Sequence, residues 1–479
     1  MKMFINGRRV EAGSGEVVEI YSSATQKLLD TVPCANPEDV REAIDAAQQG
    51  RKIWGATPVH ERSRLMMKCA DEIDRRREEL AVSLSTEMGK IIREARGEIR
   101  VCAQIFRGYA EMANHFYGNT MTDYQIGTEK DIIFTRREPL GVVACISPFN
   151  YPVELCTQKT AAALAAGNAV IIKPATDNPL TIMKIVELCH QCGIPGPVLQ
   201  LVTGSGPMVG ELLVASDKVD AVSFTGSTQV GRIIAASSAK TLKRTLLELG
   251  GNDPFIVFED ADLDKAAADA VQGRVQNAGQ TCCAPKRFIV QNSVKEEFIR
   301  RMCDNIAQLR TGSPLDEETD LGSVINEKAA AEIQRQVEHT VSQGARLVCG
   351  GKSYNKTYFQ PTILDGVTPG MDIAADMEVF GPVFPVIGFE DEEEAISIAN
   401  ATIYGLQAGV MTRDMNKAIR VASKLQCGGV VINSSGNYRH LDQPFGGWKM
   451  SGLGREGVSV TLEEMTQDKS YILKNILAE

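Results

Sequence analysis

The stretch that decides the fold is Val142-Val143-Ala144-Cys145-Ile146-Ser147, an apolar run of strand length. A helical pattern over 153–166 follows it, and then comes a second apolar run, Ala169-Val170-Ile171-Ile172-Lys173. The alternation continues with strands expected over 199–202 and 221–224 and helices expected over 180–192, 208–215 and 229–237. Strands that alternate with helices predict a parallel sheet covered by helices, an architecture that commonly binds a dinucleotide. The fold class is therefore α/β.

Regular secondary structure is also expected before and after this region of the chain. Downstream, a second alternating α/β region begins with Phe255-Ile256-Val257-Phe258 and runs to about residue 430. Upstream, residues 4–10 predict a hairpin with an Asn-Gly turn, and Asn36 is suited to cap the start of a helix. Residues 61–117 continue as mostly helical sequence, so helices are expected to dominate the first part of the chain.

The composition is that of an acidic globular protein. The chain has 479 residues, and 61 acidic against 51 basic residues give a formal net charge of −10, which disfavours binding to nucleic acid or to an anionic membrane surface. Twelve cysteines are too few for a disulfide scaffold and favour a reducing compartment. Residues 1–9 turn polar too soon for a secretory signal, and no apolar run is long enough to span a bilayer. A cytoplasmic protein is expected.

Two glycine-containing segments are candidates for holding a phosphate group. Gly204-Ser205-Gly206 with Gly210 approximates the G-x-G-x-x-G pattern, and Gly226-Ser227 opens a helix directly after a strand. Free N–H groups at a helix N-terminus favour a pyrophosphate there. Ordinary turns and helix caps explain the same residues equally well, so the glycines alone leave both interpretations open.

Two side chains are candidates for chemistry. Cys282 lies in a polar loop, and a nucleophilic thiol needs access together with a base or a lowered pKa. No histidine lies within twenty residues, which disfavours a Cys-His protease and leaves nucleophile and packing roles both open. Glu248 ends an apolar strand, where a carboxylate is costly unless it has a task such as that of a general base. Cys189 and Cys192, by contrast, close an amphipathic helix and are interpreted as packing residues.

Together these residues resemble the NAD(P)-dependent aldehyde dehydrogenase superfamily. Glu248-Leu249-Gly250-Gly251, followed 34 residues after the glutamate by Cys282, is similar to the family's glutamate and cysteine signatures. Further segments match in family order, namely Ser147-Pro148-Phe149-Asn150-Tyr151-Pro152, Ile172-Lys173-Pro174-Ala175, Phe224-Thr225-Gly226-Ser227, Glu378-Val379-Phe380-Gly381-Pro382 and Pro444-Phe445-Gly446-Gly447. The similarity covers nearly the whole chain.

The resemblance implies a subunit of three parts. A Rossmann-like cofactor domain would comprise 1–118 and 138–249, and an α/β catalytic domain would comprise 250–445. Two strands, from 119–137 and 466–479, would form a small β oligomerisation element. Members of the family are dimers or tetramers, so a homodimer or homotetramer is expected.

The resemblance also implies the role of each site residue. Cys282 would attack the aldehyde, Asn150 would hold the oxyanion, and Glu248 would activate the water that hydrolyses a thioester on Cys282. No metal would be needed. The cofactor, NAD or NADP, would lie against Ile146, Ser147, Pro148, Lys173, Thr176, Gly206, Phe224, Gly226, Ser227, Glu378 and Phe380.

Two features bear on cofactor and acyl acceptor. Strictly NAD-dependent members carry a glutamate at the position of Thr176, where it would repel a 2′-phosphate, so NADP acceptance is expected here. The CoA-acylating branch of the family lacks the base glutamate, and the presence of Glu248 therefore favours water as the acceptor and a free acid as the product.

The substrate is expected to be a short polar aldehyde, and an anionic one. Arg100, Tyr151 and Arg439 resemble the phosphate-binding residues of the non-phosphorylating glyceraldehyde-3-phosphate dehydrogenase branch, whereas Thr281 replaces a further arginine as in many succinate-semialdehyde dehydrogenases. His440 adjoins Arg439 in the same loop; alternatively, Arg439 pairs with Asp442 and only shapes that loop. Candidates are succinate semialdehyde, glyceraldehyde 3-phosphate and sulfolactaldehyde. The alternatives are a neutral lactaldehyde-type substrate, a CoA-acylating enzyme, and a catalytically silent binding or structural protein.

Overall fold

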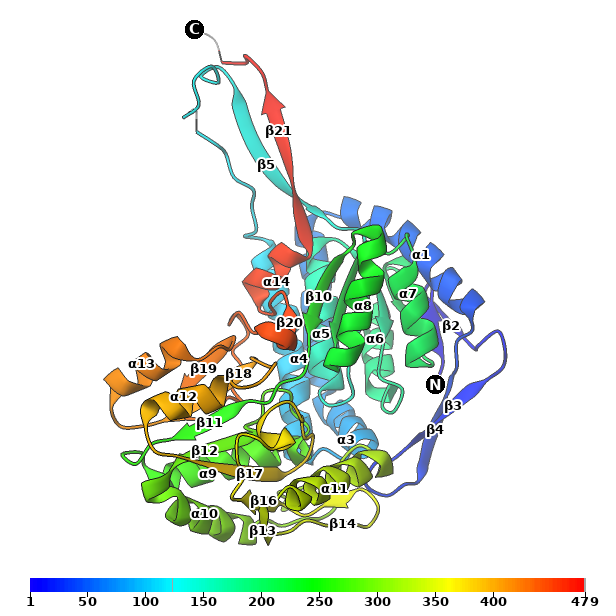
Figure 1. Cartoon of the computed structure of the whole chain (residues 1–479). Helices are drawn as coiled ribbons and strands as arrows, with labels where there is room; N and C mark the ends of the chain where they lie inside the picture. Colours follow the sequence, from blue (N-terminus) through cyan, green and yellow to red (C-terminus); the bar gives the residue numbers. More distant parts are fainter. Residues whose placement is uncertain (123, 478–479) are drawn as a thin grey trace.

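The computed structural model describes residues 1–122 and 124–477. An eight-stranded sheet organises the first part of the chain, in the order β2-β1-β8-β7-β6-β9-β10-β20 (Figure 1). The five strands β8, β7, β6, β9 and β10 run parallel, and β1 and β20 pair antiparallel at either side of them. The bounds are β1 (Met3–Ile5), β2 (Arg8–Val10), β6 (Val142–Ile146), β7 (Ala169–Lys173), β8 (Leu199–Leu201), β9 (Ala221–Thr225), β10 (Arg244–Glu248) and β20 (Gly452–Leu453).

Helices cover both faces of this sheet, which explains why the central strand β6 is apolar at every position. In β6, Val143 and Cys145 point into one core, while Val142, Ala144 and Ile146 point into the other. The first core is closed by α2 (Val59–Arg75), α3 (Arg77–Met88), α4 (Ile92–Ala113), α5 (Pro152–Ala166) and α6 (Leu180–Cys192). The second is closed by α1 (Pro37–Ala56), α7 (Glu211–Ala215) and α8 (Thr228–Ser238). The alternation predicted from the sequence is confirmed.

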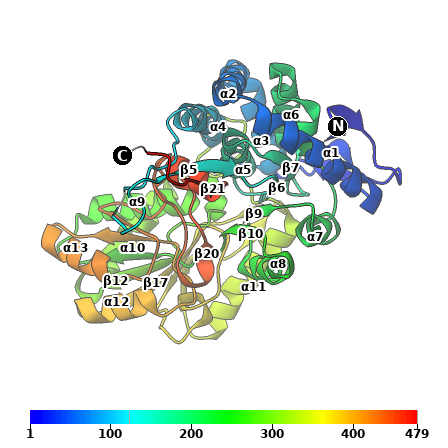
Figure 2. The ribbon, with the colours of Figure 1, turned by 90° about the horizontal axis from the view of Figure 1, so that it is seen from above.

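A seven-stranded sheet organises the second part, in the order β13-β16-β17-β12-β11-β18-β19, and only β13 is antiparallel to its neighbour. Seen from above, this part and the first part lie on opposite sides of the molecule (Figure 2). The strands are β11 (Pro254–Val257), β12 (Arg287–Gln291), β13 (Arg346–Cys349), β16 (Thr362–Asp365), β17 (Val383–Phe389), β18 (Gln407–Met411) and β19 (Gly429–Ile432). The helices are α9 (Leu263–Val275), α10 (Asn292–Ala307), α11 (Glu327–Ser342), α12 (Glu392–Asn400) and α13 (Met415–Lys424).

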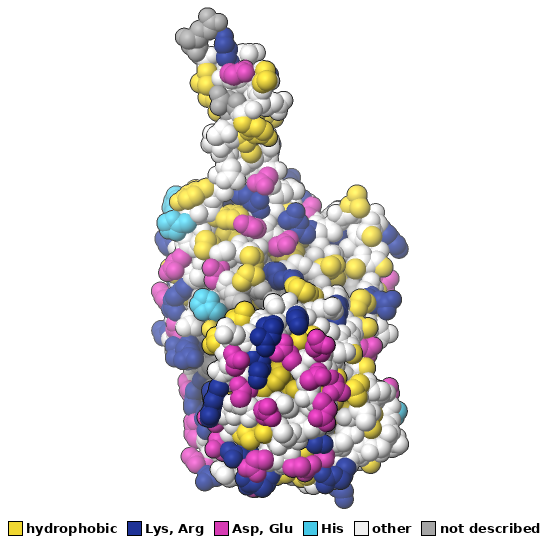
Figure 3. Space-filling model, turned by 60° about the vertical axis from the view of Figure 1, so that its left-hand side comes forward, with side chains coloured by type: hydrophobic (Ala, Val, Ile, Leu, Met, Phe, Trp, Pro, Cys, Tyr) yellow, Lys and Arg dark blue, Asp and Glu magenta, His cyan; other side chains and the backbone are white. Residues whose placement is uncertain are grey.

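A two-stranded arm stands away from the body of the molecule (Figure 1). It consists of β5 (Ile132–Pro139) paired antiparallel along its whole length with β21 (Thr466–Leu473), which follows the short helix α14 (Val458–Glu464). The arm carries hydrophobic side chains together with a few charged ones, and acidic, basic and hydrophobic side chains are mixed over the body below it (Figure 3). Two further small ribbons are β3 (Val17–Tyr21) with β4 (Leu28–Pro33) and β14 (Ser353–Tyr354) with β15 (Tyr358–Phe359).

Local expectations are confirmed at several points and corrected at two. Asn36 forms a capping box with Asp39 at the start of α1, and Asn6 and Gly7 have the positive φ angles of the predicted hairpin turn. The helix expected from Met208 instead begins as a π-helical turn over Gly206–Gly210. Strand β20 was not anticipated, because two residues held by backbone pairing leave no hydrophobic pattern. No helix among the described residues is long and apolar enough to cross a membrane.

Candidate active site

A cavity of about 1290 Å³ lies at the carboxyl ends of β6 and β9, where the order of the parallel sheet reverses. Ligands of open α/β sheets bind at this switch point. The cavity extends to the second part of the chain, which contributes the wall around Phe380 and Cys282. The predicted residues that line it are Ile146, Ser147, Pro148, Asn150, Lys173, Gly206, Phe224, Gly226, Ser227, Glu248, Cys282, Glu378 and Phe380.

The residues at the switch point suit a dinucleotide. Ser227 caps α8, and the N–H groups of that helix start face the cavity wall. Lys173 is buried, burial lowers its pKa to about 8, and its Nζ donates only to the carbonyl of Pro174 within the described chain. The buried Ser147 hydroxyl has no partner among the described residues. Unsatisfied polar groups of this kind fit a polar ligand that would complete them.

Cys282 sits on a loop that is held in a strained conformation. Asn277 and Ala278, which precede it, adopt φ angles of 51° and 54°, a left-handed region that non-glycine residues rarely occupy. The side-chain amide of Asn277 donates to the backbone carbonyl of Asn150 at 2.8 Å, and Gln280 donates to the carbonyl of Asn277 at 3.0 Å. These bonds tie the cysteine loop to the segment after β6, so Cys282 and Asn150 are positioned together.

Asn150 is also fixed from the side of α4. Lys90 Nζ donates to the Asn150 carbonyl at 3.1 Å and pairs with the buried carboxylate of Glu98. Glu98 in turn accepts the backbone N–H groups of Val153 and Glu154 at the start of α5. Neither the Asn150 side-chain amide nor the Cys282 backbone N–H has a hydrogen-bond partner among the described residues. Both donors are therefore free to bind an oxyanion.

Glu248 ends β10 with its carboxylate buried in the cavity. Neither of its oxygens has a hydrogen-bond partner in the described chain. Burial and the negative charge of Glu456 raise the pKa of Glu248 to about 7. The adjacent Cys283, burial and the Glu248 carboxylate raise the pKa of the Cys282 thiol well above its usual range. A thiol in this environment is protonated at neutral pH and needs a base, and Glu248 is the carboxylate suited to accept its proton.

A buried ionic cluster next to Glu248 was not anticipated from the sequence. Lys159, on α5, pairs with Glu456 at 2.7 Å and donates to the hydroxyl of Thr225 at 2.6 Å. Arg439 pairs with the other oxygen of Glu456 at 2.5 Å. One feature of the sequence could have indicated a buried charge, because Lys159 lies in a helix whose other residues are almost all apolar or small. Its partner is 297 residues away, and no local pattern connects the two.

The structure corrects the expectations for the two arginines. The guanidinium of Arg439 is occupied by Glu456 and, at 3.9 Å, by Glu154, and not by Asp442, which accepts hydrogen bonds from Ser459. Arg100 lies two residues from Glu98 on α4, which is about 200° around a helix. Glu98 is buried and accepts the N–H of Val153, whereas Arg100 is exposed and is not among the residues that line the cavity.

The remaining predicted substrate residues differ in placement. The hydroxyl groups of Tyr151 and Thr281 lie 3.5 Å apart beside Cys282, and Lys90 Nζ lies 3.5 Å above the Tyr151 ring. His440 is exposed, and its ring accepts the N–H of Asp442 within its own loop.

The cofactor end of the cavity departs from expectation at one residue. Thr176 does not line the cavity, because its hydroxyl donates to the carbonyl of Gly204 at 3.2 Å. Asp177 and Lys240, which the sequence did not single out, line the cavity instead. Among the described residues, no group of three or more His, Cys, Asp or Glu side chains is arranged to hold a metal ion.

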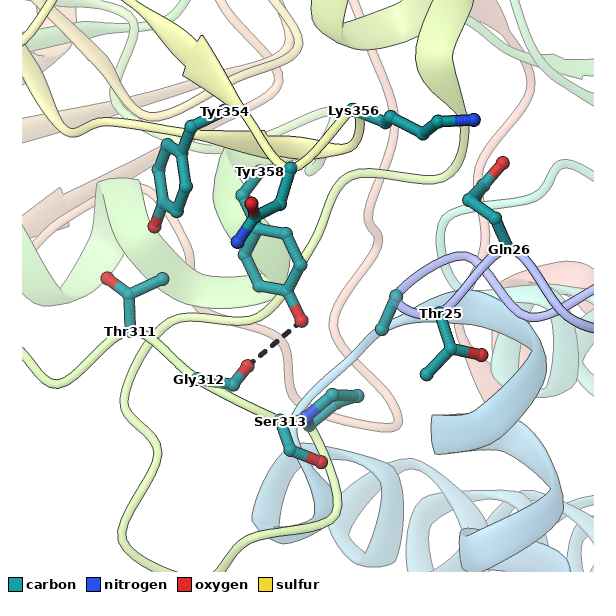
Figure 4. A pocket seen from close by; sticks show the side chains of 11 residues that line it. Thr25, Gln26, Thr311, Gly312, Ser313, Tyr354, Lys356 and Tyr358 are labelled. Carbon is teal, nitrogen blue, oxygen red and sulfur yellow. Dashed lines mark hydrogen bonds between the residues drawn. The ribbon is translucent and has the colours of Figure 1, made fainter.

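A second cavity, of about 570 Å³, lies where β14 and β15 meet the loops around Thr25 and Gly312 (Figure 4). The Tyr358 hydroxyl donates to the carbonyl of Gly312 at 3.1 Å, and the rings of Tyr354 and Tyr358 lie 5.6 Å apart. It contains none of the residues predicted for chemistry, so the larger cavity is the candidate active site.

Comparison with known proteins agrees with this geometry. The model of the aldehyde dehydrogenase family matches residues 10–471. The chain belongs to the aldehyde dehydrogenase family. It is 40% identical over 466 residues to the glutarate-semialdehyde dehydrogenase of Pseudomonas putida, covering 97% of this chain and 96% of that protein. It is 36% identical over 478 residues to the lactaldehyde dehydrogenase of Methanococcus maripaludis, covering 99% and 100%.

A solved structure gives the same result for the fold. The chain superposes with a TM-score of 0.96 on an NADP-dependent enzyme of Escherichia coli, at 37% identity and over 99% of this chain and 98% of that one. This aldehyde dehydrogenase is accordingly an NAD(P)-dependent oxidoreductase acting on an aldehyde, and it has the fold that the sequence predicted.

Proposed function

We propose that this aldehyde dehydrogenase oxidises a short polar aldehyde to the free carboxylic acid through a thioester on Cys282. The observation that carries the proposal is the unpaired, buried carboxylate of Glu248 in the same cavity as Cys282 and Asn150. A nucleophile, a base and two free oxyanion donors are the groups that acyl chemistry at an aldehyde carbon requires.

The residues act in a defined order. Glu248 accepts the proton of the Cys282 thiol, and the thiolate attacks the aldehyde carbon. The oxyanion that forms is held by the Asn150 side-chain amide and the Cys282 backbone N–H. When bound, the nicotinamide cofactor supplies the hydride acceptor. Glu248 first releases to solvent the proton that it took from the thiol. It then takes a proton from water, whose oxygen attacks the thioester carbon, and passes this proton to the departing sulfur, so that the acid leaves and the Cys282 thiol is restored.

The cofactor would be held by residues of the switch-point cavity. Lys173 would bind the adenine ribose, Ser227 the pyrophosphate and Glu378 the nicotinamide ribose, with Phe380 packing beside the nicotinamide. We propose that NADP is accepted, because Thr176 supplies no carboxylate where strictly NAD-dependent members have one. The cation of Lys240 at the cavity wall favours the same conclusion, and the carboxylate of Asp177 opposes it.

The ion pairs of the two arginines bear on which class of substrate the site can bind. Arg439 is engaged by two carboxylates, and Arg100 is exposed and does not line the cavity, so neither supplies a free cation for a substrate anion. Succinate semialdehyde, glyceraldehyde 3-phosphate and sulfolactaldehyde stay candidates. Because neither arginine offers a free charge, neutral lactaldehyde is as good a candidate substrate as these anionic aldehydes.

Two further proposals concern assembly and location. Exposed hydrophobic side chains of the arm and of the segment before β5, such as Ile472 at 56% and Ile126 at 95% exposure, favour pairing with another subunit in a homodimer or homotetramer. The twelve free cysteines, of which Cys282 has to stay reduced, favour the cytoplasm.

One panel of assays tests the function. Each of the four aldehydes and glutarate semialdehyde is supplied with NAD or NADP, with and without CoA. We expect cofactor reduction at 340 nm and a free acid by mass spectrometry, independent of CoA. Turnover that requires CoA, or full turnover by Glu248→Gln, would refute hydrolysis by Glu248, and absence of reduction with every aldehyde would indicate a silent family member.

A further inference from the structure

Arg439 has an environment that a substrate-binding arginine does not need. Its side chain is 18% exposed, and its guanidinium stacks on the ring of Phe445 at 4.4 Å. Phe445 packs against Leu406 and the two cysteines of the nucleophile loop. Arg439 thus packs on Phe445 next to the nucleophile loop, its charge is paired with Glu456, and it is not among the residues that line the cavity.

Glu456 is the carboxylate that Arg439 shares with Lys159. Burial alone would raise the pKa of Glu456, but the charges of Lys159 and Arg439 overcome it and lower that pKa to about 2. Backbone pairing fixes its position, since Glu456 and Phe445 form an antiparallel bridge. Glu456 also follows β20, whose Gly452 pairs with Glu248 itself. A permanent negative charge is therefore built in beside the base.

The negative charge of Glu456 opposes ionisation of the Glu248 carboxyl group. The charged groups that act on Glu248 are Glu456, Lys159 and Arg439, and the Cys282 thiol is a further titratable group beside it. The negative charge of Glu456 disfavours the ionised form of Glu248, whereas the positive charges of Lys159 and Arg439 favour it. Lys159 is held by both Glu456 and Thr225, so it stays in place whether or not Arg439 is present.

We propose that Arg439 is a positioning residue for thioester hydrolysis: through its ion pair with Glu456 it keeps Glu248 able to ionise near neutral pH, and it does not bind a substrate anion. The inference rests on the proposed role of Glu248 as the hydrolytic base. It assigns Arg439 an effect on every substrate, charged or neutral.

The direction in which the pH midpoint of hydrolysis shifts distinguishes this positioning role from a substrate-binding or merely structural one. Removal of Arg439 deletes a positive charge and moves the ionisation of Glu248 to higher pH. Removal of the Glu456 charge moves it to lower pH. An upward shift of about one unit reduces the ionised fraction at pH 7 from one half to about one eleventh, which is an approximately fivefold loss of hydrolysis rate that disappears at high pH. A merely structural loop would give variants with unchanged midpoints.

The hydrolytic step is measured without cofactor. p-Nitrophenyl acetate acylates the Cys282 thiolate with release of p-nitrophenolate, and water then converts the acetyl-enzyme to acetate and free thiol. Decay of the acetyl-enzyme is followed by intact-protein mass spectrometry from pH 5.5 to 9.5 in the full-length wild type and in Arg439→Gln, Arg439→Lys and Glu456→Gln. Cys282→Ala is the blank, and circular dichroism checks the fold.

We expect the midpoint to rise by about half a unit to one unit in Arg439→Gln, to return to the wild-type value in Arg439→Lys, and to fall in Glu456→Gln. An unchanged midpoint in Arg439→Gln overturns the inference. It is also overturned if Arg439→Gln raises KM for succinate semialdehyde and leaves KM for lactaldehyde unaltered, which would indicate an anion-binding arginine. Glu248→Gln serves as the separate test of the base: if it deacylates like the wild type, the proposed function fails, whatever Arg439 does.

Discussion

The buried pair of Lys90 and Glu98 gives the sharpest test of how this site is supported. Both side chains are inaccessible to solvent, and together they connect α4 to Asn150 and to the start of α5. Lys90→Met keeps most of the volume of the side chain and leaves the Glu98 carboxylate buried without its cation. Loss of one partner of a buried pair costs about 3–5 kcal/mol.

Hydrogen bonds that remain in the variant limit this loss of stability. Glu98 keeps the N–H groups of Val153 and Glu154 at 2.9 and 3.1 Å, and Asn150 keeps its bond from Asn277 at 2.8 Å. We therefore expect about 3 kcal/mol, the lower end of the range. Lys90→Met combined with Glu98→Gln removes the bare charge but retains an acceptor for the two N–H groups, and it is expected to recover at least about half of the loss.

Urea unfolding followed by tryptophan fluorescence measures these changes, because Trp54 is buried in the same part of the chain and donates to the carbonyl of Leu164. Lys265→Met is the matched control, since Lys265 pairs with Asp269 in an exposed i,i+4 pair and should change stability by less than about 0.5 kcal/mol. The reasoning is refuted if Lys90→Met costs no more than this control, or if the double variant is less stable than the single one.

Three other outcomes are expected. Asn150→Ala should lower kcat by about 10²–10³-fold with little change in KM, because its amide acts on the oxyanion, and a proportional rise in KM alone would contradict this. Thr176→Glu should reduce kcat/KM for NADP about tenfold or more relative to NAD, compared with Thr176→Gln as the uncharged control; an equal effect on both cofactors would exclude a contact with the 2′-phosphate. Replacing Ile126 and Ile472 together by Asp should yield smaller assemblies in light scattering, whereas the same size as the wild type would show that the arm is not an interface.

The parallel core could be predicted because its strands are buried on both faces. That burial leaves uninterrupted apolar runs such as the one ending at Ile146, and their alternation with helices predicted a sheet that commonly binds a dinucleotide. The orientation of Arg100 could have been obtained from helix phase, because Ile99 and Cys102 mark the buried side of α4. The same phase places Arg100 on the exposed side of α4, so its contact with a substrate stays a prediction.

The ionic cluster next to Glu248 could not be predicted from the sequence, for a different reason. Lys159 and Glu456 pair across 297 residues, and the sequence suggested for Arg439 a substrate anion or, alternatively, the nearby Asp442, but not Glu456. Ion pairs between distant segments depend on tertiary placement and leave no periodic signal. Local patterns therefore gave the elements and the reacting groups, and the charges that tune those groups required the structure.

The edge strand β20 has a consequence for how the enzyme is made. β10, which carries Glu248, pairs on one side with β9 and on the other with β20, which is translated only after the entire second sheet. At about 5–20 residues per second, the roughly 200 residues between β10 and β20 take about 10–40 seconds to synthesise. During that interval the second sheet can fold on the ribosome while the edge of β10 waits unpaired. Glu456 reaches the base only when β20 arrives, so the nascent chain acquires its nucleophile loop well before its hydrolytic centre is complete.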